Sequence, residues 1–237
     1  MLGSTIDICN HTFLPRFVGS KSVIVDLGAN HGDFSQAMME KFKCKVVAVE
    51  PVKALYDEIQ SNQEIQRYAL LNLLPIAVGG TNGTIEINVY DGRCASVLGA
   101  IRAEEGQSTQ KVEMVTLAEL RKRTGVGQID LLKMDIEGAE IDLLNGCSDE
   151  ELQSVMQMTV EFHEFLYPEQ AEPVARIIAR MRVLGFWVMP FSLDTTNVLF
   201  VNKKTGVGAG EFAVLRTFVR YGKGIVRRAR KTFGKNT

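Results

Sequence analysis

The sequence predicts an α/β fold: a doubly wound, mostly parallel seven-stranded sheet of the Rossmann-like type with an antiparallel edge. Apolar strand-like runs alternate with helix-like runs between residues 22 and 184, as in folds whose parallel strands are joined by crossover helices. Two further strand-like runs, 186–190 and 197–202, follow as a closing pair of strands. A chain of 237 residues, 46% of them hydrophobic, can bury a full core, and one domain is expected.

Each element is predicted from its own pattern of apolar residues. Strands are predicted at 22–27, 45–50, 70–78, 84–90, 111–115, 129–134, 155–162, 186–190 and 197–202. Helices are predicted at 33–43, 52–61, 138–145 and 169–184, and from Leu117 onward with Thr116 as cap. A short helix is expected around Phe13, Leu14 and Phe17, hairpin-type turn residues at 81–83, and a surface loop over the site at 91–110.

The first strand, turn and helix, residues 23–34, organise the prediction of function. An acid, Asp26, stands inside the strand end, and Gly28 and Gly32 allow a tight turn. No Gly-Lys-Ser/Thr follows, and Asn30 and Asp33 stand where a Gly-x-Gly-x-x-Gly motif needs glycine. The turn therefore suits a cofactor that lacks a pyrophosphate and has a cationic amino-acid end, although glycines that serve the turn alone would give the same pattern.

The second strand ends in a single carboxylate, Glu50, followed by Pro51. An acid at this point of a nucleotide-binding unit accepts hydrogen bonds from both ribose hydroxyls. It also disfavours the 2′-phosphate of NADP. Ala77 and Val78 end the third strand and are expected against the adenine ring, with plain core packing as an equally good explanation.

Three segments carry a resemblance to a known family: 26–35 (DLGANHGDFS), 48–51 (AVEP) and 133–140 (KMDIEGAE). On these segments the chain resembles the class I S-adenosylmethionine-dependent methyltransferases, and most closely the FkbM family, from about residue 23 to about residue 202. The first two segments are common to many methyltransferases. The third is much more specific to the FkbM family.

The resemblance implies the class I methyltransferase fold, S-adenosylmethionine as cofactor, and a hydroxyl oxygen of a sugar, glycan or polyketide-type natural product as methyl acceptor. It implies that segment 133–140 lines the region near the cofactor methyl group. N-methyltransferases often carry Asn/Asp-Pro-Pro-Tyr/Phe after the fourth strand, whereas residues 135–138 here read Asp-Ile-Glu-Gly, which favours oxygen. The predicted cofactor contacts are Glu50 at the ribose and Asp26, Gly28, Asn30 and Gly32 at the methionine end.

Lys133, Asp135 and Glu137 alternate along an extended segment and are expected to share a face. A lysine inside an apolar strand is costly to bury without a partner. Two interpretations stay open: a Lys–Asp pair that only pins the strand end, or Asp135 close to the methyl acceptor with Lys133 setting its charge state.

His163 follows an apolar strand and is the foremost candidate for the general base, because its ordinary pKa of ~6.5 lies near working pH. Glu161, two residues earlier, is expected to orient the imidazole or to bind a substrate hydroxyl. Asp135, Glu161 and His163 are also a possible set of ligands for Mg²⁺ or Mn²⁺, but no local spacing signature supports a metal. His11 and His31 are weaker candidates.

Two other function classes remain open from the residues alone. An NAD-dependent oxidoreductase also needs a glycine turn and an acid on its second strand. A non-catalytic cofactor-binding module associated with membrane would keep the same fold. The expected partner is a small-molecule or glycan acceptor, and no basic surface with interleaved aromatic residues points to nucleic acid.

The chain divides into an N-terminal extension (1–21), a methyltransferase domain (22–203) and a basic tail (204–237). From Phe212 onward stand eight Lys and Arg and no acid, which leaves 19 basic against 28 acidic residues in the remainder. The tail is expected to pack on the body as a helix, to lie on an anionic membrane surface, or to be disordered. The four scattered cysteines and the absence of a signal-like start predict a cytoplasmic protein, with the inner face of the membrane as the second location.

Overall fold

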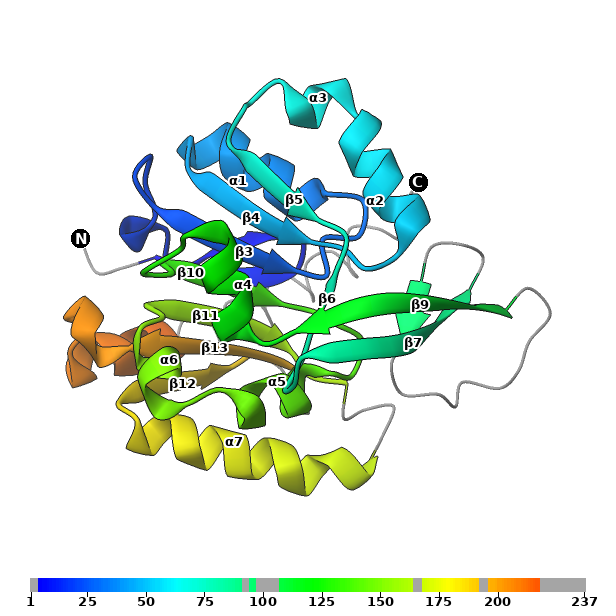
Figure 1. Cartoon of the computed structure of the whole chain (residues 1–237). Helices are drawn as coiled ribbons and strands as arrows, with labels where there is room; N and C mark the ends of the chain where they lie inside the picture. The colour runs from blue at the N-terminus through cyan, green and yellow to red at the C-terminus, as the bar shows by residue number, and fades with distance from the viewer. Residues whose placement is uncertain (1–3, 91–93, 97–106, 164–167, 192–195, 218–237) are drawn as a thin grey trace, which may run out of the picture.

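The computed structural model describes residues 4–90, 94–96, 107–163, 168–191 and 196–217. Its centre is a seven-stranded sheet in the order β12-β13-β11-β10-β3-β4-β5 (Figure 1). Five neighbouring strands are parallel, and β13 runs antiparallel to both β11 and β12. The predicted fold class is confirmed. The strands are β3 (Val23–Leu27), β4 (Lys45–Val49), β5 (Leu71–Leu74), β10 (Leu131–Met134), β11 (Gln157–Glu161), β12 (Phe186–Pro190) and β13 (Asn197–Asn202).

Helices cover both faces of this sheet, because alternate strand residues point to opposite sides. On one face, Val25 and Leu132 join a core with α4, α5, α6 and α7. On the other, Ile24 and Leu131 join a core with α1, α2 and α3. Their bounds are α1 (Asp33–Phe42), α2 (Lys53–Ser61), α3 (Gln63–Gln66), α4 (Leu117–Thr124), α5 (Glu140–Gly146), α6 (Asp149–Gln153) and α7 (Ala171–Val183). The predicted cap of α4 is present, since the Thr116 hydroxyl accepts from the Glu119 amide at 3.2 Å.

A second sheet, in the order β6-β9-β7-β8, projects from the main one (Figure 1). Its strands are β6 (Ala77–Val78), β7 (Gly83–Tyr90), β8 (Cys94–Ser96) and β9 (Gln107–Val115). The prediction of one strand over 70–78 is wrong, because the chain bends at Pro75, whose ring cannot donate to a ladder. β6 and β7 lie on opposite sides of β9 and do not pair with each other. Residues 81–83, which connect them, therefore do not form the turn of a hairpin. In the predicted loop 91–110, strands occupy 94–96 and 107–110, and the rest lies outside the described residues.

The N-terminal residues form an antiparallel pair, β1 (Ile6–Ile8) and β2 (His11–Phe13), followed by the 3-10 helix η1 (Pro15–Phe17). The helix expected from Phe13 onward is therefore wrong for Phe13, which ends a strand and is fully buried. Leu14 is also fully buried, and its amide donates to Oε1 of Gln157 on β11 at 2.9 Å. Residues 11–14 thus belong to the core of the domain.

The described part of the basic tail packs on the face of the main sheet that β2 and α1 also cover. Residues 209–217 are helical, the Phe212 ring stacks on Trp187 at 4.8 Å between centroids, and Leu215 is buried. Most of the basic residues of the tail lie outside the described residues. Among the helices that the structure describes, none has the length and apolar character needed to cross a membrane.

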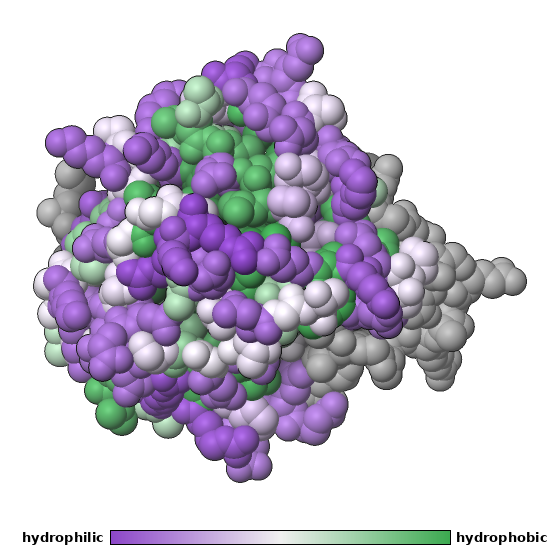
Figure 2. Space-filling view, in the orientation of Figure 1, coloured by the Kyte–Doolittle hydropathy of each residue, from purple (hydrophilic) through white to green (hydrophobic). Residues whose placement is uncertain are grey.

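Hydrophilic side chains dominate the molecular face seen in Figure 2, except where apolar ones gather over the edge of the main sheet. The edge strand β5 carries three half-buried leucines, Leu71, Leu73 and Leu74. The polar groups that concern function lie elsewhere, at the carboxyl ends of β3, β4, β10 and β11.

Candidate functional site

The glycine turn between β3 and α1 lies directly against the end of β10. The Gly28 and Ala29 amides both donate to the Val49 carbonyl at 3.0 Å, which ties the turn to β4. Gly28 has a φ of +77°, and a Cβ on it would lie 1.9 Å from the backbone oxygen of Asp135. Only glycine fits here, because any side chain would collide with the neighbouring backbone. The turn and the segment after β10 are therefore a single packed unit.

Gly28→Ala is expected to abolish detectable binding of S-adenosylhomocysteine and to destabilise the protein by roughly 1–3 kcal/mol, because the turn must move away from Asp135. Calorimetric titration and thermal unfolding measure the two effects. Gly127→Ala is the matched control, since a Cβ there meets nothing within 4 Å. A Gly28→Ala protein that binds like the wild type would show that the turn does not shape the site.

Glu50, at the end of β4, is 4% exposed, and backbone amides hold both of its carboxylate oxygens. The Asn30 amide donates to Oε2 and the Val52 amide to Oε1, each at 2.8 Å. Burial raises the pKa of Glu50 to about 7, and the two amides oppose that rise only in part. The carboxylate is thus oriented in advance and keeps lone pairs for a further donor.

A pocket opens between Glu50 and the second sheet. Gly28, Asn30 and Asp135 line it together with Glu50. Apolar side chains of β6, β7 and β9 form the opposite wall, which the sequence analysis did not foresee beyond Ala77 and Val78. The residues from these three strands are Ala77, Val78, Ile85, Ile87 and Met114. An apolar slot with one fixed carboxylate fits an adenosine, whose ring needs an apolar wall and whose ribose needs an acceptor.

Asp26 and Lys133 form a buried pair beneath the glycine turn. They are register neighbours on β3 and β10, and Lys133 Nζ lies 3.3 Å from Asp26 Oδ1. The ammonium also donates to the carbonyls of Leu27 at 3.2 Å and Gly28 at 2.5 Å, and the Ser35 hydroxyl donates to Asp26 Oδ2 at 2.6 Å. Lys133 lies farther from Asp135, at 4.0 Å, so Asp26 is the closer of the two carboxylates, and both interpretations of Lys133 stay predictions.

Asp26 and Gly32 do not line the pocket in the described residues. Gly32 has a φ of +84° and stands before α1, where a Cβ would lie 2.8 Å from Ile65 Cδ1. Both residues can therefore influence a cofactor through the shape of the turn that they support. Their predicted direct contact with the methionine end stays a prediction.

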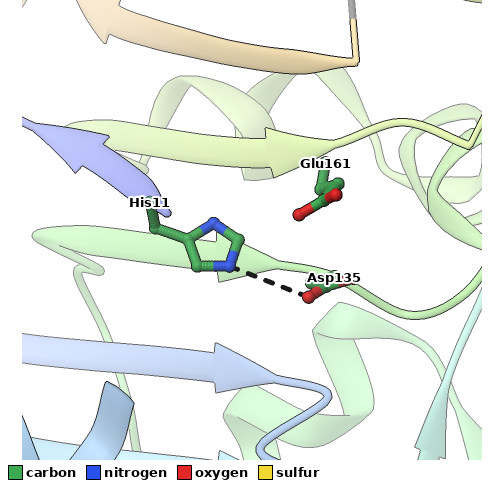
Figure 3. A group of neighbouring side chains, drawn as sticks. All are labelled: His11, Asp135 and Glu161. Atoms are coloured by element: carbon green, nitrogen blue, oxygen red, sulfur yellow. Dashed lines mark ion pairs between the residues drawn. The ribbon is translucent and has the colours of Figure 1, made fainter. Parts of the chain in front are cut away.

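Asp135 joins the pocket to a second group of polar side chains. His11 on β2 and Glu161 at the end of β11 point towards it (Figure 3). His11 Nε2 lies 3.8 Å from Asp135 Oδ2. Burial would raise the pKa of Asp135, but the His11 imidazole and the Lys133 ammonium outweigh it and lower that pKa. The pKa of Glu161 is raised, first by burial and then by the charge of Asp135.

His163 is surrounded by carboxylates on another side of Asp135. Its Nδ1 lies 3.3 Å from Glu140 Oε1, and its Nε2 lies 3.3 Å from Glu137 Oε2 and 3.9 Å from Asp135 Oδ1. Burial alone would lower the pKa of His163, but the Glu140 side chain, followed by Glu137 and Asp135, raises it to about 9. His163 is therefore an imidazolium near neutral pH, and an imidazolium has no lone pair with which to accept a proton.

Most of the residues predicted for the site lie close together in the structure. Gly28, Asn30, Glu50, Ala77, Val78 and Asp135 line one pocket, and Lys133, Glu161 and His163 lie beside it, as the spacing at the strand ends predicts. His11, a weaker candidate from the sequence, also lies near Asp135. The one local signal is its position two residues before the apolar pair Phe13 and Leu14.

The comparisons with known proteins agree with this geometry. The model of the methyltransferase FkbM domain matches residues 26–188. Methyltransferase sdnD of Sordaria araneosa is 27% identical over 175 residues, 61% of this chain and 68% of that protein. Methyltransferase 1 of Beauveria bassiana is 25% identical over 159 residues, 59% of this chain and 64% of that protein. The aligned part thus spans about two thirds of each relative.

Solved structures that match this chain include Sp1610 of Streptococcus pneumoniae, described as a putative tRNA (m1A22) methyltransferase. It has a TM-score of 0.43 and 11% identity, and the match covers 92% of this chain and 83% of that one. Fibrillarin of Aeropyrum pernix with bound S-adenosylmethionine has a TM-score of 0.42 and 11% identity, over 84% and 81% of the two chains. The family match spans well over half of the residues, and the chain therefore belongs to the FkbM family of class I S-adenosylmethionine-dependent methyltransferases.

Proposed function

We propose that this protein transfers the methyl group of S-adenosylmethionine to a hydroxyl oxygen of a sugar, glycan or polyketide-type natural product. The observation that carries the proposal is the position of Asp135, which lines the cofactor pocket and also contacts the polar group of His11 and Lys133. An acceptor bound there would meet the cofactor on one side and carboxylates on the other.

The reaction is an in-line displacement. A lone pair of the acceptor oxygen forms the new bond to the methyl carbon, the carbon–sulfur bond breaks, and its electron pair stays on sulfur to give S-adenosylhomocysteine. The hydroxyl proton leaves to a nearby base or to water. The protein contributes alignment of the two reactants and a polar environment for the departing proton.

The cofactor side of the proposal assigns one role to each group. Glu50 accepts from the ribose hydroxyls, and Ala77 and Val78 pack on the adenine. Gly28 and Asn30 face the rest of the cofactor from the turn, where their backbone can approach closely. Asp26 and Lys133 support that turn from below.

The acceptor side is built from Asp135, Glu161 and His11. A group of carboxylates can accept hydrogen bonds from a hydroxyl, whereas it would leave an acceptor amine protonated and unreactive. This is the structural reason to prefer oxygen. His163, proposed from the sequence as the base, is better suited to hold Glu137 and Glu140 in place, because its raised pKa keeps it cationic.

A methyl-transfer screen tests the function. The protein is incubated with S-adenosylmethionine labelled in its methyl group and with pairs of glycosides, nucleotide sugars and macrolides, each as the hydroxyl compound and as its amino analogue. Label is expected in a methyl ether, and mass spectrometry locates it. Label in the amino analogue alone would contradict the choice of oxygen.

Thermal unfolding tests the cofactor separately. S-adenosylhomocysteine at saturating concentration is expected to raise the melting temperature, and NADH is expected to leave it unchanged. Stabilisation by NADH alone would reverse the assignment. Loss of turnover in Asp135→Ala, with S-adenosylhomocysteine binding retained, would distinguish an enzyme from a binding module.

A further inference from the structure

We propose that His11, Asp135 and Glu161 hold a divalent cation of the Mg²⁺ or Mn²⁺ type, and that this cation binds the acceptor oxygen. The inference rests on the proposed function, whose acceptor side it specifies. The three residues come from distant parts of the chain, and one ligand atom of each lies within 4.8 Å of the others (Figure 3).

The separation of the ligand atoms suits one shared ion. His11 Nε2 and Asp135 Oδ2 are 3.8 Å apart, which is too long for a direct hydrogen bond. Two atoms that each lie ~2.1 Å from one octahedral cation are separated by about 3 Å when adjacent and by about 4.2 Å when opposite. The observed distance falls inside that interval, so a cation can bridge the gap without a large movement.

The His11 side chain is buried, and one of its two ring nitrogens has no hydrogen-bond partner among the described residues. The residue is 2% exposed, and its ring packs edge-on against Phe34 at 5.7 Å between centroids. Nδ1 is buried and has no hydrogen-bond partner among the described residues. In the proposed site the ion binds Nε2, the nitrogen that faces Asp135 at 3.8 Å, and the ring proton then stays on the buried Nδ1.

The local charges also leave room for a dication. Asp26, Asp135, Glu137, Glu140 and Glu161 supply five carboxylates around this point, and Lys133 and His163 supply two cations. Lys133 is nearest to Asp26, and His163 is nearest to Glu137 and Glu140. Asp135 lies 4.0 Å from Lys133 and 3.9 Å from His163, so Glu161 is the carboxylate of this group whose charge these two cations balance least.

A second group with ligand-like spacing, Asp135, Glu140 and His163, is a poorer metal site. Both oxygens of Glu140 already accept backbone amides: Oε1 from Ile136 at 2.9 Å, and both from Gly138 at 3.1–3.2 Å. Glu140 also faces His163 at 3.3 Å. Glu140 is thus held by the backbone and is less available as a metal ligand than Glu161.

The ligand set predicts the chemistry of the acceptor. Three protein ligands leave about three positions of an octahedral cation for other oxygens. An acceptor with two neighbouring oxygens, such as a vicinal diol or an α-hydroxy carbonyl, would bind through both. The cation lowers the pKa of the bound hydroxyl; its proton passes to water, and the oxygen lone pair attacks the methyl carbon while the electron pair of the broken carbon–sulfur bond stays on sulfur.

Binding of Mn²⁺ to the full chain, freed of metal with EDTA, tests the site without cofactor or acceptor. Electron paramagnetic resonance of free Mn²⁺ counts bound ions and gives the dissociation constant. We expect one saturable site per chain in the wild type. In Glu161→Gln and Asp135→Asn, near-isosteric changes that keep the packing, we expect affinity to fall at least tenfold.

His31→Gln is the matched control, because it removes an exposed histidine that pairs with Glu58 at 2.9 Å outside the proposed site. That variant is expected to bind Mn²⁺ like the wild type. Absence of saturable binding, or binding lost in His31→Gln and kept in Glu161→Gln, would overturn the proposal. Titration of the same samples with S-adenosylhomocysteine distinguishes the failures, since the proposed function can hold when the metal site does not.

Discussion

Lys133→Ala is expected to lower the free energy of unfolding by about 3–5 kcal/mol, because it leaves the Asp26 carboxylate charged and buried without its cation. Asp26 is fully buried, and Lys133 is 4% exposed. The ammonium also binds two carbonyls of the glycine turn, so the variant is expected to lose affinity for S-adenosylhomocysteine. Urea unfolding measures the first effect, and calorimetry measures the second.

A second substitution separates charge from packing. In Lys133→Ala with Asp26→Asn, the buried charge is absent, and the Asn oxygen can still accept from Ser35. This double variant is expected to regain a substantial part of the lost stability. Lys53→Ala is the surface control, because its pair with Asp57 is largely exposed and little change is expected. Equal loss in the single and double variants would show that the charge of Asp26 is not the cause.

Glu50→Gln is expected to weaken binding of S-adenosylhomocysteine about 10- to 100-fold at pH 8, because the charged acceptor of the ribose hydroxyls is lost. The pKa of Glu50 is raised to about 7, first by burial. The ionised form is the better acceptor, so the affinity of the wild type is expected to rise with pH up to about 7 and to level above it. Below that value, affinity falls by up to about tenfold per pH unit.

The affinity of Glu50→Gln should change much less over the same pH range, and the two curves should approach each other below pH 6. Calorimetric titrations between pH 5.5 and 8.5 give both curves. Glu64→Gln changes an exposed acid paired with Arg67 and should keep the wild-type curve. A wild-type affinity that does not change across pH 7 would contradict ribose recognition by the Glu50 carboxylate.

Local patterns were sufficient for most of the main sheet and for placing Gly28 and Glu50 together at one pocket. The strands 186–190 and 197–202 were predicted with the bounds that the structure has, because alternation and apolar runs report directly on a strand. Gly28 and Glu50 were recognised for a similar reason. A turn glycine and an acid at a strand end can both be recognised from the few residues next to that strand.

The second sheet was only partly predictable. Pro75 favours an edge or a bend, but nothing near it indicates that Ala77 and Val78 leave the main sheet to pair with β9. That pairing joins segments more than 35 residues apart, and its register depends on which apolar faces meet. The apolar wall of the pocket follows from this pairing, so the sequence could not name Ile85, Ile87 or Met114 as part of it.

By itself, the sequence determined the order of the elements, the family, and the carboxylates and glycines at the strand ends, since each of these depends on neighbouring residues. Only the tertiary structure decided what those groups do to one another. Parallel register brings Lys133 beside Asp26, the β1–β2 pair brings His11 to Asp135, and the turn after β10 surrounds His163 with carboxylates. Charge state and partner choice follow from distances of a few ångströms across the fold, and spacing along the chain does not contain those distances.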